Sequence, residues 1–524
     1  MRAEERYDLI VIGAGINGAA IAREAALAGL KTLIVERGDI SCGTSSASSR
    51  LIHGGLRYLE HAELDLVRES LLERERLLRL APHLVEPLEL CIPVYRGARR
   101  GRWQIGVGLA LYDLLSAGKS LPRRRSFTRD ELLRHMPGLN ADGLVGGASY
   151  YDAQVRYPER LVVENVCDAV ANGATLETHT RVTRIRVDGG RAVGVDWQSA
   201  RGAGGAAAPL IVNAAGPWVD DVLGSIRHTR LIGGTKGSHI VVPRFEGSPR
   251  SGVYVEAGAD QRPFFILPWN GLLLIGTTDE RYEGDAGLAT IDARERAYLV
   301  AETERVFPGA AGLGGRVLYT HTGVRPLPYE PRGSEGAITR RHLVRRHRAA
   351  RGLYSIVGGK LTTHRALAED VLRKLRGELP RPASRNLTRE RPLPGALSAA
   401  DRSALLAELA ARFGERRAQR WLAVYGRRAA DVAALAARPE LGAPLGDSDV
   451  LTAELVHGIT AEWAVTLEDL LQRRCMAGLD ADFGLTVAPA AAAALTQLEL
   501  WDAARAAHEL ASYRELAARH GAAG

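Results

Sequence analysis

Residues 7–36 read YDLIVIGAGINGAAIAREAALAGLKTLIVE, and this stretch decides the fold. The apolar run over 7–12 predicts a buried strand. The apolar spacing over 16–27 predicts a helix that ends at Gly29, and the run over 31–35 predicts a second strand. A strand–helix–strand unit of this kind is typical of a parallel sheet flanked by helices.

The turn between the first strand and the helix carries the pattern GxGxxG, with Gly13, Gly15 and Gly18. Gly13 permits the turn, Gly15 lets the backbone approach a pyrophosphate, and Gly18 lets helix and strand pack closely. Glu36 ends the second strand, where its carboxylate can accept hydrogen bonds from ribose hydroxyls and disfavours a 2′-phosphate. The pattern in this context predicts a dinucleotide site, for FAD or NAD.

Three further segments favour FAD. Residues 41–49 (SCGTSSASS) are rich in hydroxyl groups, which can bond the diphosphate and ribityl chain of a long cofactor. Glycine-bearing turns also follow strand-like runs at 213–216 (NAAG) and 358–360 (GGK). Because these segments are far apart in the chain, they indicate one extended cofactor across a discontinuous domain.

The rest of the chain divides by pattern. Residues 230–290 alternate between apolar and polar positions and predict an antiparallel sheet, whereas residues 397–524 have helical spacing and predict a separate helical domain. The expected organisation is FAD-binding segments at 1–80, 151–229 and 319–380, substrate-domain segments at 81–150 and 230–318, and a helical domain at 395–524.

Composition narrows the classes of function. The chain has 524 residues and a formal net charge of +8, which leaves anionic substrates, membrane surfaces and nucleic acid open. No run long and apolar enough to span a bilayer and no secretory signal is found. The four cysteines, at 42, 91, 167 and 475, form no CxxC pair, so we expect a reducing compartment and no metal site.

Beyond these features, the chain resembles the aerobic, quinone-linked, FAD-dependent glycerol-3-phosphate dehydrogenases. The matching segments are DLIVIGAGINGAAIA (8–22), TSSASSRLIHGGLRYLEH (44–61), NAAGPW (213–218), TKGSHIVVP (235–243), IGTTD (275–279), THTGVRPL (320–327), VGGKLTT (357–363) and AEWAVTLEDLLQRR (461–474). They run in order over most of the chain.

The resemblance implies a mixed α/β (α+β) fold: a Rossmann-like FAD-binding domain of the glycine-oxidase/D-amino-acid-oxidase type, an antiparallel-sheet substrate domain and a C-terminal helical domain. It implies oxidation of glycerol 3-phosphate at C2 to dihydroxyacetone phosphate, with hydride transfer to FAD and electrons passed to quinone. The cofactor-binding residues expected are Gly13, Gly15, Ile16, Asn17, Gly18, Glu36, Arg37, Thr44, Ser45, Ser46, Ser48, Ser49, His53, Gly54, Gly55, Val182, Ala215, Gly216, Gly359, Lys360, Leu361 and Thr362.

For the substrate, the resemblance implies that Arg57, Tyr58 and Lys360 bind the phosphate. Arg325 is expected to bind near C2 and to stabilise the charge that develops as the hydroxyl proton leaves. His239 is the expected general base, because imidazole titrates near neutrality. His321 and His364 are weaker candidates for a proton relay. One departure from the family pattern lies at 157–161 (YPERL), which places local packing or a partner contact in doubt more than the chemistry.

The resemblance also implies access to membrane quinone. Residues 102–125 combine an apolar stretch with a basic end, which favours a cytoplasmic protein attached peripherally to the inner face of the cell membrane. A core helix followed by a basic loop explains the same segment at least as well. A homodimer is an open expectation, and no nucleic-acid partner is expected. Two other functions stay open: an oxygen-using FAD oxidase of glycerol 3-phosphate or another small substrate, and a non-catalytic flavin-binding or nucleic-acid-binding protein.

Overall fold

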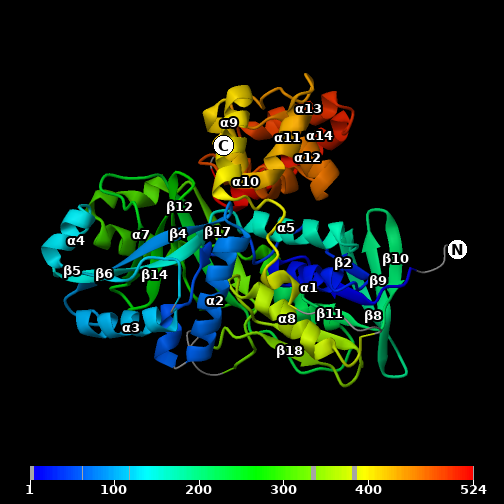
Figure 1. The fold of residues 1–524 in the computed structure, drawn as a ribbon, viewed down its shortest axis with the longest axis horizontal. Coiled ribbons are helices and arrows are strands. Elements are labelled where there is room, and N and C mark those ends of the chain that lie inside the picture. Colours follow the sequence, from blue (N-terminus) through cyan, green and yellow to red (C-terminus); the bar gives the residue numbers. More distant parts are fainter. Residues whose placement is uncertain (1–4, 62, 117, 332–337, 380–385, 523–524) are drawn as a thin grey trace.

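The computed structural model describes residues 5–61, 63–116, 118–331, 338–379 and 386–522. Figure 1 shows two sheet-based parts lying side by side, with the C-terminal helices stacked above their junction. Among the described residues no helix has the length and apolar content needed to cross a bilayer.

The first part is built on the parallel sheet predicted from residues 7–36. Its strands run in the order β18-β19-β11-β1-β2-β7, and all pair in parallel except β18, which is antiparallel to β19. They span Leu343–Arg346, Leu353–Val357, Ile211–Asn213, Leu9–Ile12, Thr32–Val35 and Thr175–Glu177. β1 and β2 are wholly buried, as strands covered on both faces must be. In this order, strands from segments far apart in the chain form one sheet.

Helices cover one face of this sheet, and a small sheet covers the other. The helices are α1 (Ile16–Leu27), α5 (Pro158–Ala171) and α8 (His364–Leu375). Buried alanines along α1 let its neighbours approach closely. The small antiparallel sheet consists of β8 (Thr180–Asp188), β9 (Arg191–Ser199) and β10 (Gly202–Ala207), and its apolar side chains pack against β1 and β2.

The second part contains the predicted antiparallel sheet. Its order is β16-β12-β15-β14-β13-β4-β6-β3, with β17 paired to β12 and β5 paired to β6; only β13 and β4 pair in parallel. In chain order the strands are β3 (Leu51–Ile52), β4 (Val85–Tyr95), β5 (Arg125–Thr128), β6 (Leu144–Val155), β12 (Thr235–Val242), β13 (Gly252–Glu256), β14 (Pro263–Trp269), β15 (Leu272–Gly276), β16 (Glu280–Arg281) and β17 (Tyr319–Arg325). The helices between and beside them are α2 (Leu64–Leu80), α3 (Arg102–Leu115), α4 (Arg129–His135) and α7 (Ala293–Val306), whereas the short helix α6 (Val219–Leu223) packs on β8 and β19 of the first part.

One expected boundary differs in the structure. Residues 319–380 were expected in the FAD-binding domain, yet β17 pairs along its whole length with β12 of the second sheet. The register places Arg325 opposite Thr235 and His321 opposite His239. The chain therefore leaves the substrate-domain sheet only after Arg325, which carries this side chain to the junction of the two parts.

The helical domain expected at 395–524 is present. Its helices are α9 (Ala399–Phe413), α10 (Glu415–Tyr425), α11 (Ala429–Ala436), α12 (Thr452–Glu462), α13 (Val487–Gln497) and α14 (Ala503–Arg519), and a π-helical turn, η9, spans Asp469–Arg474.

Buried ion pairs hold this domain on the rest of the chain. Arg160, in the segment that departs from the family pattern, forms a two-bond pair with Glu462 at 2.5 and 2.7 Å. Arg473 and Arg474 of η9 both bond Asp39, at 2.6–2.8 Å, three positions after Glu36. The departure at 157–161 thus lies at a domain contact.

Candidate cofactor and substrate site

The glycine-rich turn lies at the carboxyl end of β1, and its geometry explains two of its glycines. Gly13 has a φ of +104°, and a Cβ added there would lie 2.7 Å from the Ala214 carbonyl oxygen. A Cβ on Gly18 would lie 1.9 Å from the Gly13 carbonyl oxygen. Gly15 differs, because its Cβ would meet only the Ser45 hydroxyl, at 3.4 Å. Gly15 thus keeps space open at the start of α1, since it has no side chain of its own to cap the helix.

Glu36 is held in place beside this turn. Its Oε2 accepts a hydrogen bond from the Ala14 amide at 2.7 Å, and its Oε1 accepts one from the Gly38 amide at 2.9 Å. Burial raises the pKa of the Glu36 carboxyl, and the two amide bonds oppose that shift. Each carboxylate oxygen keeps a further acceptor position for a ribose hydroxyl.

A cavity opens where the carboxyl ends of β1, β2, β11 and β19 meet, which is the usual ligand position in such sheets. Of the predicted cofactor residues, it is lined by Gly13, Gly15, Ile16, Asn17, Glu36, Arg37, Thr44, Ser45, Ser48, Val182, Ala215, Gly216, Gly359, Lys360 and Leu361. Sequence reasoning missed the lining residues Cys42, Arg181, Trp218 and Pro326. Trp218 had a signal in the NAAGPW segment, and the Arg37 guanidinium lies 3.6 Å from the centre of its ring.

The cavity fits an extended dinucleotide. Ser45 accepts a hydrogen bond from the Ile16 amide at 3.0 Å, so the hydroxyl-rich segment lies directly over the helix start. The Asn17 Oδ1 is buried and has no hydrogen-bond partner among the described residues. Its Nδ2 donates to the Gly358 carbonyl at 3.3 Å, which joins the first and last cofactor segments. An unbonded acceptor in the cavity lining suits the ribityl hydroxyls of FAD, which can donate to it, whereas backbone amides and hydroxyl groups suit the diphosphate.

The other predicted cofactor residues lie just outside the cavity lining. Thr362 accepts a hydrogen bond from the His53 amide at 3.1 Å, and the Gly54 amide donates to the Tyr112 hydroxyl at 2.8 Å. Ser46 lines an adjoining cavity. Gly55 has a φ of +81°, and a Cβ added there would lie 2.1 Å from the Tyr58 ring. These bonds fix the 53–55 loop beside the end of the cavity at Lys360.

Lys360 and Tyr58 are brought together at that end. The Lys360 ammonium lies 4.2 Å from the centre of the Tyr58 ring and donates to the Ser70 hydroxyl at 2.8 Å. Burial lowers the pKa of Lys360 to about 7, partly opposed by Glu69. The side chain of Arg57 lies outside the part of the chain that the structure describes.

His239 and Arg325 come from the paired strands β12 and β17. The His239 Nε2 lies 2.8 Å from the Ser49 hydroxyl of the hydroxyl-rich segment. Burial and the nearby Arg325 lower the pKa of His239 to about 3. A Cβ on Gly276 would lie 2.4 Å from the His239 Cδ2, so the neighbouring strand needs glycine to make room for this ring. The imidazole is therefore neutral at physiological pH.

A carboxylate that sequence reasoning missed organises the cations. Asp279 accepts a hydrogen bond from Arg325 Nη1 at 3.1 Å and another from Arg340 Nη2 at 3.2 Å. Thr277 accepts a bond from Arg325 Nη2 at 2.9 Å. Asp279 and Thr277 lie in the IGTTD segment, but Arg340 lies in no recognised motif. The positive charge of Arg340 also contributes to the lowered pKa of Lys360. We therefore treat Arg325 and Arg340, which share Asp279, together with Lys360 as one cationic group.

The two weaker relay candidates have different surroundings. His321 lies next to His239 across the strands and is buried with its Nε2 unbonded among the described residues. His364 starts α8, and its Nδ1 lies 2.7 Å from the Leu361 carbonyl oxygen. Burial lowers the pKa of both groups.

Comparison with known proteins gives consistent results. Residues 8–372 match the family model described as FAD dependent oxidoreductase, and residues 386–506 match the C-terminal domain of alpha-glycerophosphate oxidase. The chain is 42% identical to a glycerol-3-phosphate dehydrogenase of Synechocystis sp., over 97% of this chain and 96% of that one. It is 38% identical to the D-erythritol 1-phosphate dehydrogenase of Brucella abortus, over 90% and 95%. The solved structure of the FAD complex of glycerol-3-phosphate dehydrogenase from Bacillus halodurans has a TM-score of 0.80 at 26% identity and covers 99% of this chain and 96% of its own.

Proposed function

Because the chain belongs to the FAD-dependent oxidoreductases, and among them to the glycerol-3-phosphate dehydrogenase family, we propose that it oxidises glycerol 3-phosphate at C2 to dihydroxyacetone phosphate and passes the electrons to a membrane quinone. The observation that carries this proposal is the pair of arginines, Arg325 and Arg340, held by Asp279 next to a neutral buried histidine, together with Lys360 in the lining of the cofactor cavity.

In this proposal the substrate phosphate is bound by Lys360 and Arg340. Lys360 offers a point charge, and the planar guanidinium of Arg340 suits two-bond contact with phosphate oxygens. Asp279 holds Arg325 and Arg340 in position without neutralising the group, since Lys360 lies outside that contact. A phosphate dianion would complete the charge balance of the site.

FAD, when bound, supplies the acceptor for the hydride that leaves C2. The protein must remove the hydroxyl proton at the same time. His239 is neutral, so one of its ring nitrogens can accept that proton, and the Ser49 contact fixes the ring orientation. Because its pKa without substrate is about 3 and not near neutrality, this role requires the negative charge of the bound phosphate and of the developing alkoxide to raise the basicity of the ring. Arg325 donates hydrogen bonds to the C2 oxygen as negative charge develops on it.

Anaerobic reduction of the bound flavin tests this proposal. We expect glycerol 3-phosphate to bleach the yellow colour rapidly, and glycerol alone to do so poorly because it lacks the phosphate. D-Erythritol 1-phosphate belongs in the panel because the Brucella abortus relative is named for it. Faster reduction by that substrate would replace our substrate assignment, and a flavin that no phosphorylated polyol reduces would reject the dehydrogenase.

The electron acceptor is tested separately. The match to the C-terminal domain of alpha-glycerophosphate oxidase keeps an oxygen-using enzyme as the second candidate. With glycerol 3-phosphate and a soluble quinone we expect fast turnover and little peroxide. Prompt peroxide formation without any added acceptor would favour the oxidase instead.

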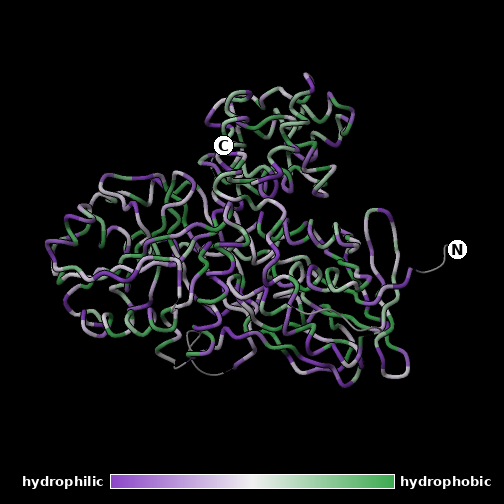
Figure 2. Tube along the Cα trace, in the orientation of Figure 1, coloured by the Kyte–Doolittle hydropathy of each residue, from purple (hydrophilic) through white to green (hydrophobic). Residues whose placement is uncertain are grey.

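Helix α3 is our proposed membrane contact. Ile105, Leu109 and Tyr112 bury one side of the helix. The opposite side exposes 79% of Trp103, 50% of Val107, 36% of Leu111 and 71% of Leu114. The helix lies at the lower left edge of the molecule, and its trace is largely white to green in the hydropathy colouring (Figures 1 and 2). Exposed arginines at 123–125 follow it and suit anionic headgroups.

We expect the chain to sediment with anionic lipid vesicles, and the double variant Trp103→Ser/Leu114→Ser to bind about 100-fold more weakly, from roughly 3 kcal/mol of lost apolar burial. Leu288→Ser is the matched control, because Leu288 is also 64% exposed but lies elsewhere on the surface. Equal sedimentation of the double variant and the control would remove α3 from this role.

A further inference from the structure

A cluster of three side chains in the substrate domain has no part in the proposed reaction. Glu89 and Cys91 lie two positions apart on β4, so their side chains are on the same face of the sheet. His135 is the last residue of α4, which lies against the neighbouring strand β6. None of the three lines the cofactor cavity. His135 is far from the other two in the sequence, but the sheet and the helix bring all three together.

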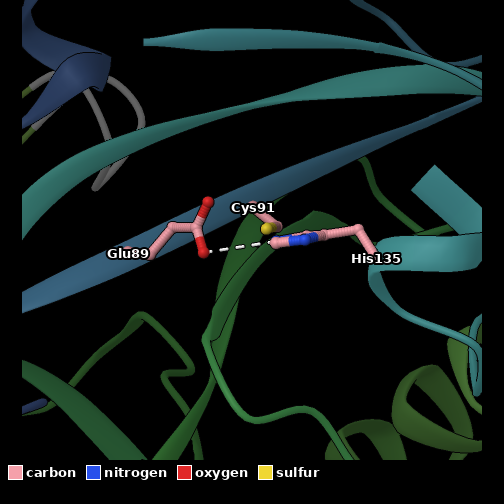
Figure 3. A group of neighbouring side chains, drawn as sticks. All are labelled: Glu89, Cys91 and His135. Atoms are coloured by element: carbon pink, nitrogen blue, oxygen red, sulfur yellow. Dashed lines mark hydrogen bonds and ion pairs between the residues drawn. The ribbon is translucent and has the colours of Figure 1, made fainter. Parts of the chain in front are cut away.

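The ligand atoms of this cluster converge. One carboxylate oxygen of Glu89, the Cys91 sulfur and one ring nitrogen of His135 all lie within 4.8 Å of one another. The His135 Nε2 is 3.2 Å from the Glu89 Oε2. Figure 3 shows the carboxylate and the imidazole approaching from opposite sides, with the sulfur beside the ring. Tetrahedral zinc bonds of roughly 2.0–2.3 Å place neighbouring ligand atoms about 3.3–3.8 Å apart, so these atoms need to close by at most about 1.5 Å.

The surroundings already orient these ligands. The His135 ring is stacked on Phe127, with 5.0 Å between centroids and 22° between planes. The Cys91 sulfur is 3.6 Å from the Ser251 hydroxyl, which can hold a thiolate in place. The side chains of His135 and Glu89 are 32% and 19% exposed, whereas Cys91 is fully buried. An ion can therefore enter from solvent and keep a water ligand on its open side.

Two other groups of possible ligands among the described residues are already balanced by cations. In one group the carboxylates of Asp39 and Asp469 bond arginines of η9, and in the other Glu295 and Glu280 bond Lys236 and Arg294. The cluster of Glu89, Cys91 and His135 differs because it combines three ligand types, thiol, imidazole and carboxylate. This mixture suits zinc and similar borderline-soft divalent ions.

We propose that Glu89, Cys91 and His135 form a binding site for a divalent transition-metal ion of the zinc class, with a solvent-facing fourth position. The ion fastens α4 to β4 and stabilises the outer edge of the substrate domain. It takes no part in the oxidation of the substrate.

Cobalt titration of the full-length, FAD-loaded chain, stripped of metal by a chelator, is the test. We expect one cobalt per chain, a thiolate-to-cobalt charge-transfer band read as a difference against the flavin spectrum, and competition by zinc. Cys91→Ala should abolish the band. His135→Gln should weaken binding at least about 100-fold, since a ligand matters more than its supporting contacts. His508→Ala, which removes an exposed histidine of α14, is the matched control and should titrate like the parent.

Thermal unfolding gives a second readout. Zinc should raise the Tm of the parent and of His508→Ala but not of His135→Gln, and all three should reduce their flavin at the same rate. If Cys91→Ala does not fold, His135→Gln at the exposed helix end decides the question alone. An absent thiolate band, or a band and a Tm shift that survive in His135→Gln, would overturn the site without bearing on the dehydrogenase.

Discussion

Arg325→Ala is expected to slow anaerobic flavin reduction by glycerol 3-phosphate by about 10²–10³-fold while the protein stays yellow. The size of the effect is that of removing a preorganised donor to a developing oxyanion. Arg325 comes from the last position of β17 and contacts Thr277 and Asp279, and Gly237 makes room for its guanidinium. The measurement is stopped-flow absorbance of the flavin at saturating substrate.

The variant should remain folded, because Asp279 keeps its ion pair with Arg340. Arg294→Ala is the control, since Arg294 pairs with Glu280 at 2.6 Å but is 78% exposed. Arg325→Lys should recover part of the rate, because lysine keeps the charge and loses the two-pronged geometry. Normal reduction in Arg325→Ala would refute the role that we propose for this arginine.

Lys360→Met is expected to lower kcat/KM for glycerol 3-phosphate by about 100-fold, from roughly 3 kcal/mol of lost charge-assisted contact with the phosphate. Lys374→Met is the matched control, because Lys374 lies on α8, is 44% exposed and pairs with Asp370 at the surface. Most of the loss should appear in KM, since the phosphate is remote from the reacting carbon.

The pH dependence sharpens this prediction. With its pKa lowered to about 7, Lys360 of the free enzyme is charged below that pH and loses its charge as pH rises through it. The kcat/KM of the parent should therefore fall on the alkaline side of neutrality. In the complex the phosphate stabilises the ammonium, so the same decline in kcat should occur at higher pH. Lys360→Arg should remove the decline, and an unchanged profile in that variant would contradict the assignment.

Local patterns predicted the cofactor side of the molecule well. The turn at 13–18, the acid at position 36 and the parallel sheet follow from short-range rules, because glycine spacing and strand hydrophobicity act within one strand–helix–strand unit. The cavity then gathers the turns at 215–216 and 359–361, as the discontinuous-domain hypothesis required. Which of its residues contact FAD stays a prediction.

The substrate side depends on tertiary register, which the sequence does not reveal. Asp279 meets Arg325 only because β17 and β15 both pair with β12. Arg340 reaches the same carboxylate from a segment without periodicity or motif. Likewise, the 44 positions between Cys91 and His135 hide a contact that β4, β6 and α4 create. The sequence also does not reveal whether the apolar residues of α3 face the protein core or a lipid surface, since an apolar helix can do either.

The attachment of η9 to Asp39 has a consequence for how this chain can be divided. Arg473, Arg474 and Asp39 are all buried, so separating the last 130 or so residues would remove both counter-charges of Asp39 and uncover the surface around it. A truncated version would thus lose its structure next to Glu36 and the cofactor cavity. The C-terminal helical domain and the part built on the parallel sheet should therefore unfold in a single thermal transition. A chimera of two related proteins must take Asp39 and the two arginines of η9 from the same parent.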